Sequence, residues 1–147
     1  QGIAILLVGD TEFGAIDVLK RLDQWHWTYV LRQKAGTLIC LDGQMEWRDF
    51  GSWVKKPGQS MWLGNCWLTQ YKRYPENLLA YWKMGEDEPW CLATNLPDQH
   101  ATLRAYARRM WIEEMFGDLK NHGFDLECTM LRHADRLSRL TLAVALL

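Results

Sequence analysis

The chain has 147 residues, of which 48% are apolar and 24% are charged, and its formal net charge is −1. These are ordinary values for a single globular domain that is long enough to form a core. The cysteines lie far apart and form no CxxC pair, so neither a zinc site nor a disulfide scaffold is indicated. We therefore expect reduced thiols in a cytosolic protein.

The start of the chain has the pattern of a strand, a helix and a second strand. Residues 3–8 form a continuous apolar run stopped by a Gly-Asp pair, which predicts a buried central strand. Asp10 or Thr11 can cap a helix over residues 13–25, and residues 27–33 are typical of the second strand. This order predicts an α/β layer with a right-handed crossover.

The middle of the chain, residues 35–95, has a different composition. Glycines separate short segments rich in Trp, Tyr and Leu, which predicts an antiparallel, β-rich insertion within one domain. Nine tryptophans are unusual, and although most are expected in the core, such an excess also suits surfaces that stack on bases. Residues 20–73 hold nine Lys or Arg against four Asp or Glu, a balance compatible with a polyanionic partner.

The end of the chain is predicted to be helical. One helix runs from about residue 99 to Asn121, where Asn121 and Gly123 supply a stop, and a second runs from about residue 129 to the end. The final apolar run is too short to span a bilayer, and no signal peptide is present. Because the chain opens without Met and closes inside an apolar helix, we expect it to be a piece of a longer protein.

Four polar residues in the first of these helices are the most informative feature. At about 100° per residue, Tyr106, Arg109, Glu113 and Lys120 fall at roughly 0°, 300°, 340° and 320°. We call these four residues the polar stripe. The neighbouring arc of about 140–280° is apolar and predicts a face that packs on a core. That arc contains Trp111, Ile112, Met115, Phe116 and Leu119.

The polar stripe has two interpretations. A carboxylate flanked by Arg, Lys and Tyr can hold a metal ion beside a phosphodiester, and the alternative is a solvated helix face with ion pairs. Asp10 likewise suits a ligand site at the end of a strand or a simple helix cap. Together with Glu113 it offers the oxygen ligands that Mg²⁺ prefers, and two such ions can activate and stabilise the oxygens of a phosphodiester. Glu114 lies off the stripe, so Glu113 is the preferred candidate.

The spacing of the stripe resembles the catalytic-helix motif of bacterial DDE transposases of the insertion-sequence-four type. That motif is Tyr, two residues, Arg, three residues, Glu, six residues, Lys. The sequence GDTEFG around Asp10 is similar to the family's strand-end motif with the second catalytic Asp. The β-rich segment between Asp10 and Glu113 and the tail LSRLTLAVALL also resemble the family, so the resemblance covers essentially the whole chain.

The resemblance implies a partial ribonuclease H-like catalytic core over residues 1–147, α/β in class, with a β-rich insertion at about 35–95 and two C-terminal helices. It also implies Mg²⁺-dependent cleavage of transposon ends and strand transfer into target DNA, with Mn²⁺ as a substitute ion. The implied partners are double-stranded DNA, at transposon ends and target, and a second copy of the protein in a synaptic homodimer. The implied location is the bacterial cytoplasm, in association with the nucleoid.

The family's site residues carry over to matching positions. Asp10 and Glu113 resemble metal ligands, and Arg109 and Lys120 resemble groups that grip phosphates, Arg by a bidentate fork and Lys as a point charge. Tyr106 resembles a contact to DNA near the cleaved end.

One tryptophan also has a counterpart in the family. The insertion of similar enzymes ends in an aromatic residue that stacks on a base flipped out of the duplex, and in EPWCLATNLP that position is Trp90. Such stacking is worth roughly 1–3 kcal/mol. The alternative is that Trp90 is a core residue of the insertion.

Two departures from the family pattern matter. The family has a first catalytic Asp on an earlier strand, and nothing here precedes Gln1 that provides it, while Asp17 lies within the first predicted helix. The chain alone is therefore expected to lack one of three metal ligands and to be inactive or impaired. The second departure is Thr11, where relatives often carry Arg. The alternatives are a ribonuclease H-like nuclease without strand transfer and a non-catalytic DNA-binding remnant of a transposase.

Overall fold

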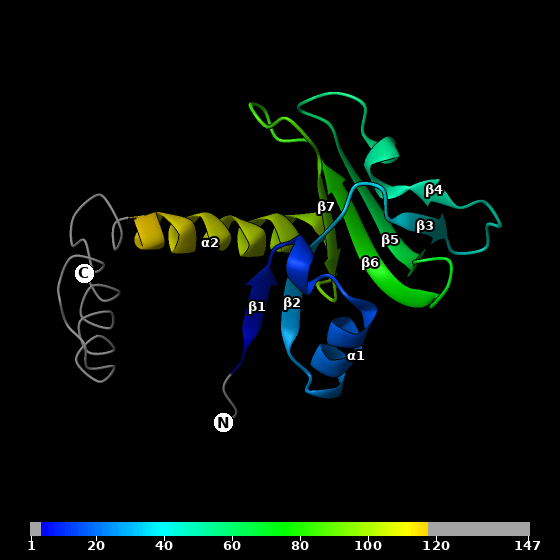
Figure 1. Ribbon diagram of the computed structural model, residues 1–147, viewed down its shortest axis with the longest axis horizontal. Helices are drawn as coiled ribbons and strands as arrows, with labels where there is room; N and C mark the ends of the chain where they lie inside the picture. The colour runs from blue at the N-terminus through cyan, green and yellow to red at the C-terminus, as the bar shows by residue number, and fades with distance from the viewer. Residues whose placement is uncertain (1–3, 118–147) are drawn as a thin grey trace. The chain divides into compact units, whose positions relative to one another are not determined.

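The structure, a computed structural model, describes residues 4–117 (Figure 1). The chain divides into two compact units, Gln1–Tyr106 and Ala107–Leu147. The described elements are β1 (Leu6–Gly9), the 3₁₀ turn η1 (Thr11–Phe13), α1 (Ile16–Gln24), β2 (Thr28–Gln33), β3 (Leu38–Leu41), β4 (Arg48–Asp49), the 3₁₀ turn η2 (Phe50–Trp53), β5 (Ser60–Leu68), β6 (Tyr74–Tyr81), β7 (Trp90–Thr94) and α2 (Gln99–Gly117).

One mixed sheet contains all seven described strands, in the order β1-β2-β7-β6-β5-β3-β4. The pair β1–β2 is parallel, and every other neighbouring pair in the described sheet is antiparallel. The expected α/β class is confirmed at this level, as are the opening strand-helix-strand unit and the β-rich middle of the chain.

The first helix is shorter than the sequence predicts. The apolar spacing of Ile16, Leu19 and Leu22 is confirmed, since all three are buried under α1. Phe13 was expected in the same helix, but it ends the 3₁₀ turn η1 and is 53% exposed. The break lies at Gly14, where an added Cβ would lie 2.8 Å from the carbonyl oxygen of Arg32. The chain therefore turns in close contact with the end of β2 before α1 begins.

The structure also corrects the predicted position of the first strand in the sheet. Its apolar run predicts a buried central strand, yet β1 lies at one edge of the described sheet and pairs on one side only, with β2. Leu6 and Leu7 are accordingly half-buried. An apolar strand resembles a central strand in sequence whether or not a second neighbour is present, so the sequence does not reveal this edge position.

The strands of the β-rich insertion belong to the same sheet as β1 and β2. Its longest pair is the hairpin of β5 and β6, with a register shift between Trp62 and Gly64, and β7 returns to pair with β2 (Figure 1). Alternate residues of each strand face opposite sides of a sheet. On one side, Tyr29 and Leu31 of β2 pack with the buried side chains of α1. On the other side, Val30 packs with Ala105 and Tyr106 of α2.

Candidate functional site

Asp10 occupies the position that the sequence predicts, directly after β1. Its Oδ1 accepts a hydrogen bond of 2.7 Å from the backbone N–H of Thr11, so the side chain caps η1. The sequence predicts Asp10 or Thr11 as the cap of the helix over residues 13–25, but Asp10 caps the preceding turn η1 instead, and the cap residue of α1 is Ala15. A carboxylate has about four lone-pair sites, so a capping bond does not by itself exclude a cation.

Arg109 and Glu113 are brought together on α2. Arg109 Nη2 lies 2.6 Å from Glu113 Oε1, one helical turn away, and the two side chains are 22% and 48% exposed. This arrangement is the ion-paired helix face that the sequence also allowed. Pairs of this kind stabilise a helix by about 0.3–0.5 kcal/mol, so formation of the helix does not depend on this ion pair.

Tyr106 and Trp90 both lie in the core of the first unit. Tyr106 is 2% exposed and Trp90 is 7% exposed, and their rings meet edge to face at 5.0 Å between centroids. The Nζ atom of Lys83 lies 5.3 Å from the centroid of the Trp90 ring. The alternative of a core position for Trp90 thus describes this structure. A contact with DNA from either ring would require that the ring be uncovered.

The burial of Tyr106 shows that the polar stripe begins on a buried side of the helix. By helical spacing Thr102 and Ala105 fall at about 320° and 260° on the wheel used above, and both are buried with Tyr106. Within residues 99–106 of α2, the side that packs on the sheet therefore spans the start of the stripe and, at Ala105, the adjoining part of the apolar arc. Trp111, which opens that arc, is 71% exposed.

The remaining predicted site residues are placed only in part. Lys120 lies outside the described residues, and Glu114 is exposed on α2. Asp10 belongs to the first unit and Glu113 to the second, so each is described within its own unit. The carboxylate oxygens of both residues suit Mg²⁺ chemically. Among residues 4–117, no group of three or more His, Cys, Asp or Glu side chains is arranged to hold a metal ion.

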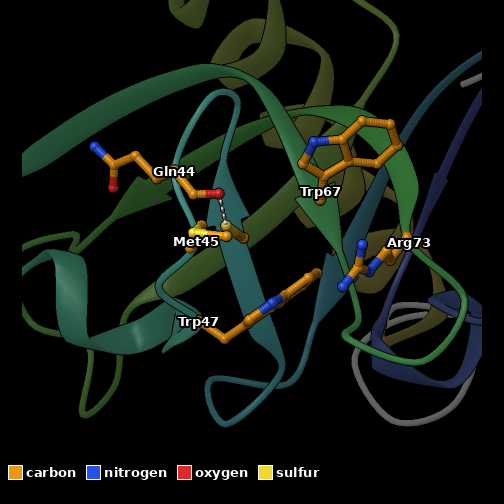
Figure 2. A pocket seen from close by; sticks show the side chains of 6 residues that line it. Gln44, Met45, Trp47, Trp67 and Arg73 are labelled. Carbon is orange, nitrogen blue, oxygen red and sulfur yellow. Dashed lines mark hydrogen bonds between the residues drawn. The ribbon is translucent and has the colours of Figure 1, made fainter.

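A hollow in the β-rich insertion was not identified from the sequence. It has a volume of about 350 Å³, and its polar and aromatic lining includes Trp47, Trp67 and Arg73. Figure 2 shows the guanidinium group of Arg73 close to the indole side chains of Trp47 and Trp67. Its carbon Cζ lies 5.9 Å from the centroid of the Trp47 ring. The tryptophan excess and the basic balance of residues 20–73 were the sequence signals for such a surface.

A buried polar network on the α1 side of the sheet was also missed. The hydroxyl of Tyr29 lies 2.5 Å from Oε2 of Glu76 and 3.2 Å from Oδ2 of Asp23, which also accepts a hydrogen bond from Tyr74. Glu76 is 6% exposed, and its burial raises the pKa of the carboxyl group to about 8. A lone Glu in a strand gives no sequence signal for such a network, because its partners come from distant segments.

The described cysteines show no reactive environment. Cys40, Cys66 and Cys91 are free and buried, in agreement with the expected reduced thiols. Burial raises the pKa of both Cys66 and Cys91 to about 12. These two thiols therefore stay protonated near neutral pH and are poor nucleophiles.

Comparison with protein-family models found no match, and comparison with curated proteins likewise found none. Within the described residues, no helix combines the length and the apolar character needed to cross a bilayer.

Proposed function

We propose that the chain is the C-terminal part of the catalytic domain of a DDE transposase of the insertion-sequence-four type, with a ribonuclease H-like core. The observation that carries the proposal is the spacing of Tyr106, Arg109, Glu113 and Lys120, four residue types at three fixed intervals. Asp10 at the carboxyl end of a strand supports it, because open α/β sheets place ligand-binding groups there.

In this proposal Asp10 and Glu113 share one role. Each carboxylate would be a ligand of Mg²⁺, and the ion would supply Lewis-acid chemistry for the oxygens of a phosphodiester. The ion pair with Glu113 keeps the Arg109 guanidinium beside the carboxylate. From that position Arg109 can exchange its partner for a DNA phosphate, which it would bind by a bidentate fork. Lys120 would add a second positive charge to the same phosphate-binding side of the helix.

The edge position of β1 is consistent with the missing third carboxylate. The family needs an Asp from an earlier strand. Within the described sheet β1 pairs only with β2, so the backbone groups along its other edge are open to a further strand. A strand from sequence preceding Gln1 that paired there in parallel would bring its own carboxyl end to the level of Asp10.

The composition of the insertion supports a nucleic-acid partner. Base–aromatic stacking combined with a nearby cation is a common means of binding nucleic acids without sequence preference. The hollow of Trp47, Trp67 and Arg73 offers two indole rings and a guanidinium group in one place (Figure 2). This composition supports DNA as the proposed partner, and the resemblance to the family would add a homodimer in a synaptic complex at the bacterial nucleoid.

The proposal is tested in the full-length protein with an Asp10→Asn variant and an Asp17→Asn control. Asp17 lies on the exposed side of α1, where Lys72 Nζ contacts its Oδ2 at 2.7 Å, so its loss leaves the site intact. With Mg²⁺ and transposon-end DNA, the wild type and Asp17→Asn are expected to cleave the ends and to join them to target DNA. Asp10→Asn is expected to do neither while still binding DNA.

The products of the same assay separate the alternatives. Nicked DNA with no joined product would indicate a ribonuclease H-like nuclease without strand transfer. DNA binding without cleavage in the wild type would indicate a non-catalytic remnant. Unchanged cleavage by Asp10→Asn would refute the assignment of Asp10.

A further inference from the structure

A second hollow lies where α1 begins, next to the ends of β2 and β5. Its volume is about 280 Å³, and its lining combines the start of α1 with polar side chains of three other segments. The polar side chains in its wall are Thr11, Glu12, Gln33, Lys34, Thr37 and Thr69.

Two buried polar atoms in this wall have no hydrogen-bond partner. They are Nε2 of Gln33 and Oγ1 of Thr69. Gln33 is only 5% exposed, although it lies at the end of a strand where a polar side chain could reach water. Leaving a buried donor unsatisfied is costly, and native proteins rarely do so without a ligand, an ion or an ordered water. Both atoms belong to residues that line one hollow, and this points to a ligand that binds there.

The start of α1 adds further donors to the same hollow. The first backbone N–H groups of a helix have no partner within the helix, and they attract negative charge. The cap residue here is Ala15, which makes no side-chain hydrogen bond to them. Gly14 lets the chain approach the end of β2, because an added Cβ would lie 2.8 Å from Nε2 of Gln33. Both Ala15 and Ile16 line the hollow.

The charges in the wall balance, so the donor groups rather than a net charge favour an anion. Lys34 contributes one positive charge and Glu12 one negative charge, while the amide, the hydroxyls and the helix N–H groups are neutral donors. A phosphodiester carries one negative charge and offers oxygens to several donors at once. A cation would find mainly donors in this wall, with Glu12 the only acidic side chain among those that line it.

We propose that this hollow binds a phosphate group of the DNA backbone, with Gln33 and Thr69 as hydrogen-bond donors and Lys34 as the countercharge. The DNA part of this inference rests on the proposed function, whereas binding of phosphate does not. Glu12 lies in η1, the turn that Asp10 caps, so a backbone phosphate held here would fix the register of the DNA relative to Asp10.

The first experiment measures inorganic phosphate binding to the purified chain by calorimetry and by thermal shift, against sodium chloride at equal ionic strength. The wild type is expected to bind phosphate saturably. Gln33→Leu and Thr69→Val keep side-chain volume but remove the donors, and each is expected to weaken phosphate binding about tenfold. Neither is expected to lower the melting temperature without phosphate, because each replaces an unsatisfied buried group. Loss of folding in both would itself overturn the proposal, by showing that the two groups have structural partners.

Variants of the two charged side chains in the wall, Lys34 and Glu12, test independently whether the hollow binds an anion. Lys34→Gln is expected to weaken phosphate binding, and Glu12→Gln is expected to strengthen it. Lys56→Gln, an exposed lysine outside this hollow, is the matched control and is expected to change nothing. If the wild type shows no saturable phosphate binding, or if Gln33→Leu binds as tightly as the wild type, the hollow holds only water and the proposal is wrong.

The second experiment measures DNA binding by the full-length protein. Gln33→Leu is expected to lower the affinity for DNA about tenfold. Lys34→Gln is expected to release about one counterion fewer on DNA binding, so the slope of log K against log salt becomes shallower. Weaker phosphate binding with unchanged DNA binding would overturn the assignment to the DNA backbone. Absence of cleavage by the wild type would count against the transposase assignment alone, because neither phosphate nor DNA binding depends on it.

Discussion

The indole ring of Trp90 and the phenol ring of Tyr106 meet edge to face with 5.0 Å between their centroids, and both rings are buried. This pair joins β7 to the first turns of α2 and anchors the helix on the sheet. Two residues that the sequence connects with DNA thus lie in the buried core of the first unit. The burial of Tyr106 also shows which side of residues 99–106 packs on the sheet.

Replacing Trp90 should cost stability rather than DNA contacts. Trp90→Ala removes a large buried ring and leaves a cavity, so we expect the free energy of unfolding to fall by about 3–5 kcal/mol. Trp90→Phe keeps an aromatic ring against Tyr106 and should lose less. Urea denaturation followed by circular dichroism measures both. A stable Trp90→Ala variant that no longer binds DNA would contradict the core position.

Stability should depend on pH through Glu76. Burial raises its pKa in the folded chain to about 8 from an ordinary value of 4.5. Between these values the folded chain keeps a proton that the unfolded chain has lost. Stability therefore falls as pH rises through this window, by at most about 1.4 kcal/mol per pH unit.

The substitution Glu76→Gln should remove this dependence. A Gln amide can donate a hydrogen bond to the hydroxyl oxygen of Tyr29, as the protonated acid can, and it does not titrate. Denaturation curves from pH 5 to pH 8 should become flatter in the variant. Glu46→Gln is the control, since the neighbouring Arg48 lowers the pKa of the Glu46 carboxyl group, which places its titration below this window. An equally steep curve in Glu76→Gln would show that another group is responsible.

The hollow in the insertion should contribute to binding of single-stranded DNA. Arg73→Ala removes the cation beside Trp47, and we expect the slope of log K against log salt to fall by about 0.7. Trp67→Ala should lower affinity roughly tenfold with the salt slope unchanged, because stacking releases no counterions. Fluorescence anisotropy at several salt concentrations measures both quantities. Unaltered affinity in both variants would exclude the hollow as a DNA contact.

Local patterns in the sequence predicted the elements better than their arrangement. The spacing of Ile16, Leu19 and Leu22 identified α1, and the glycine-separated segments identified the β-rich insertion. The sequence did not reveal that β7 returns to pair with β2, because strand pairing depends on contacts between distant segments. The edge position of β1 was hidden for the same reason.

The candidate site was predictable only where its signal is local. Asp10 at the end of a strand and the Arg109–Glu113 pair follow from short spacings, and both are found as expected. Tyr106 was placed on a polar face, but the side of a helix that is buried depends on the sheet beneath it. The unsatisfied amide of Gln33 and the Tyr29–Glu76 contact join separate segments, so no sequence spacing indicates them.

The most direct test of the account is the rate of Mg²⁺-dependent cleavage of transposon-end DNA by Glu113→Gln in the full-length protein, with Glu114→Gln as the matched control. Both residues lie on α2, and loss of the Arg109 ion pair should cost at most about 0.5 kcal/mol, so both variants should fold. We predict that Glu113→Gln binds DNA but does not cleave it, while Glu114→Gln cleaves at the wild-type rate. Undiminished cleavage by Glu113→Gln would contradict the account.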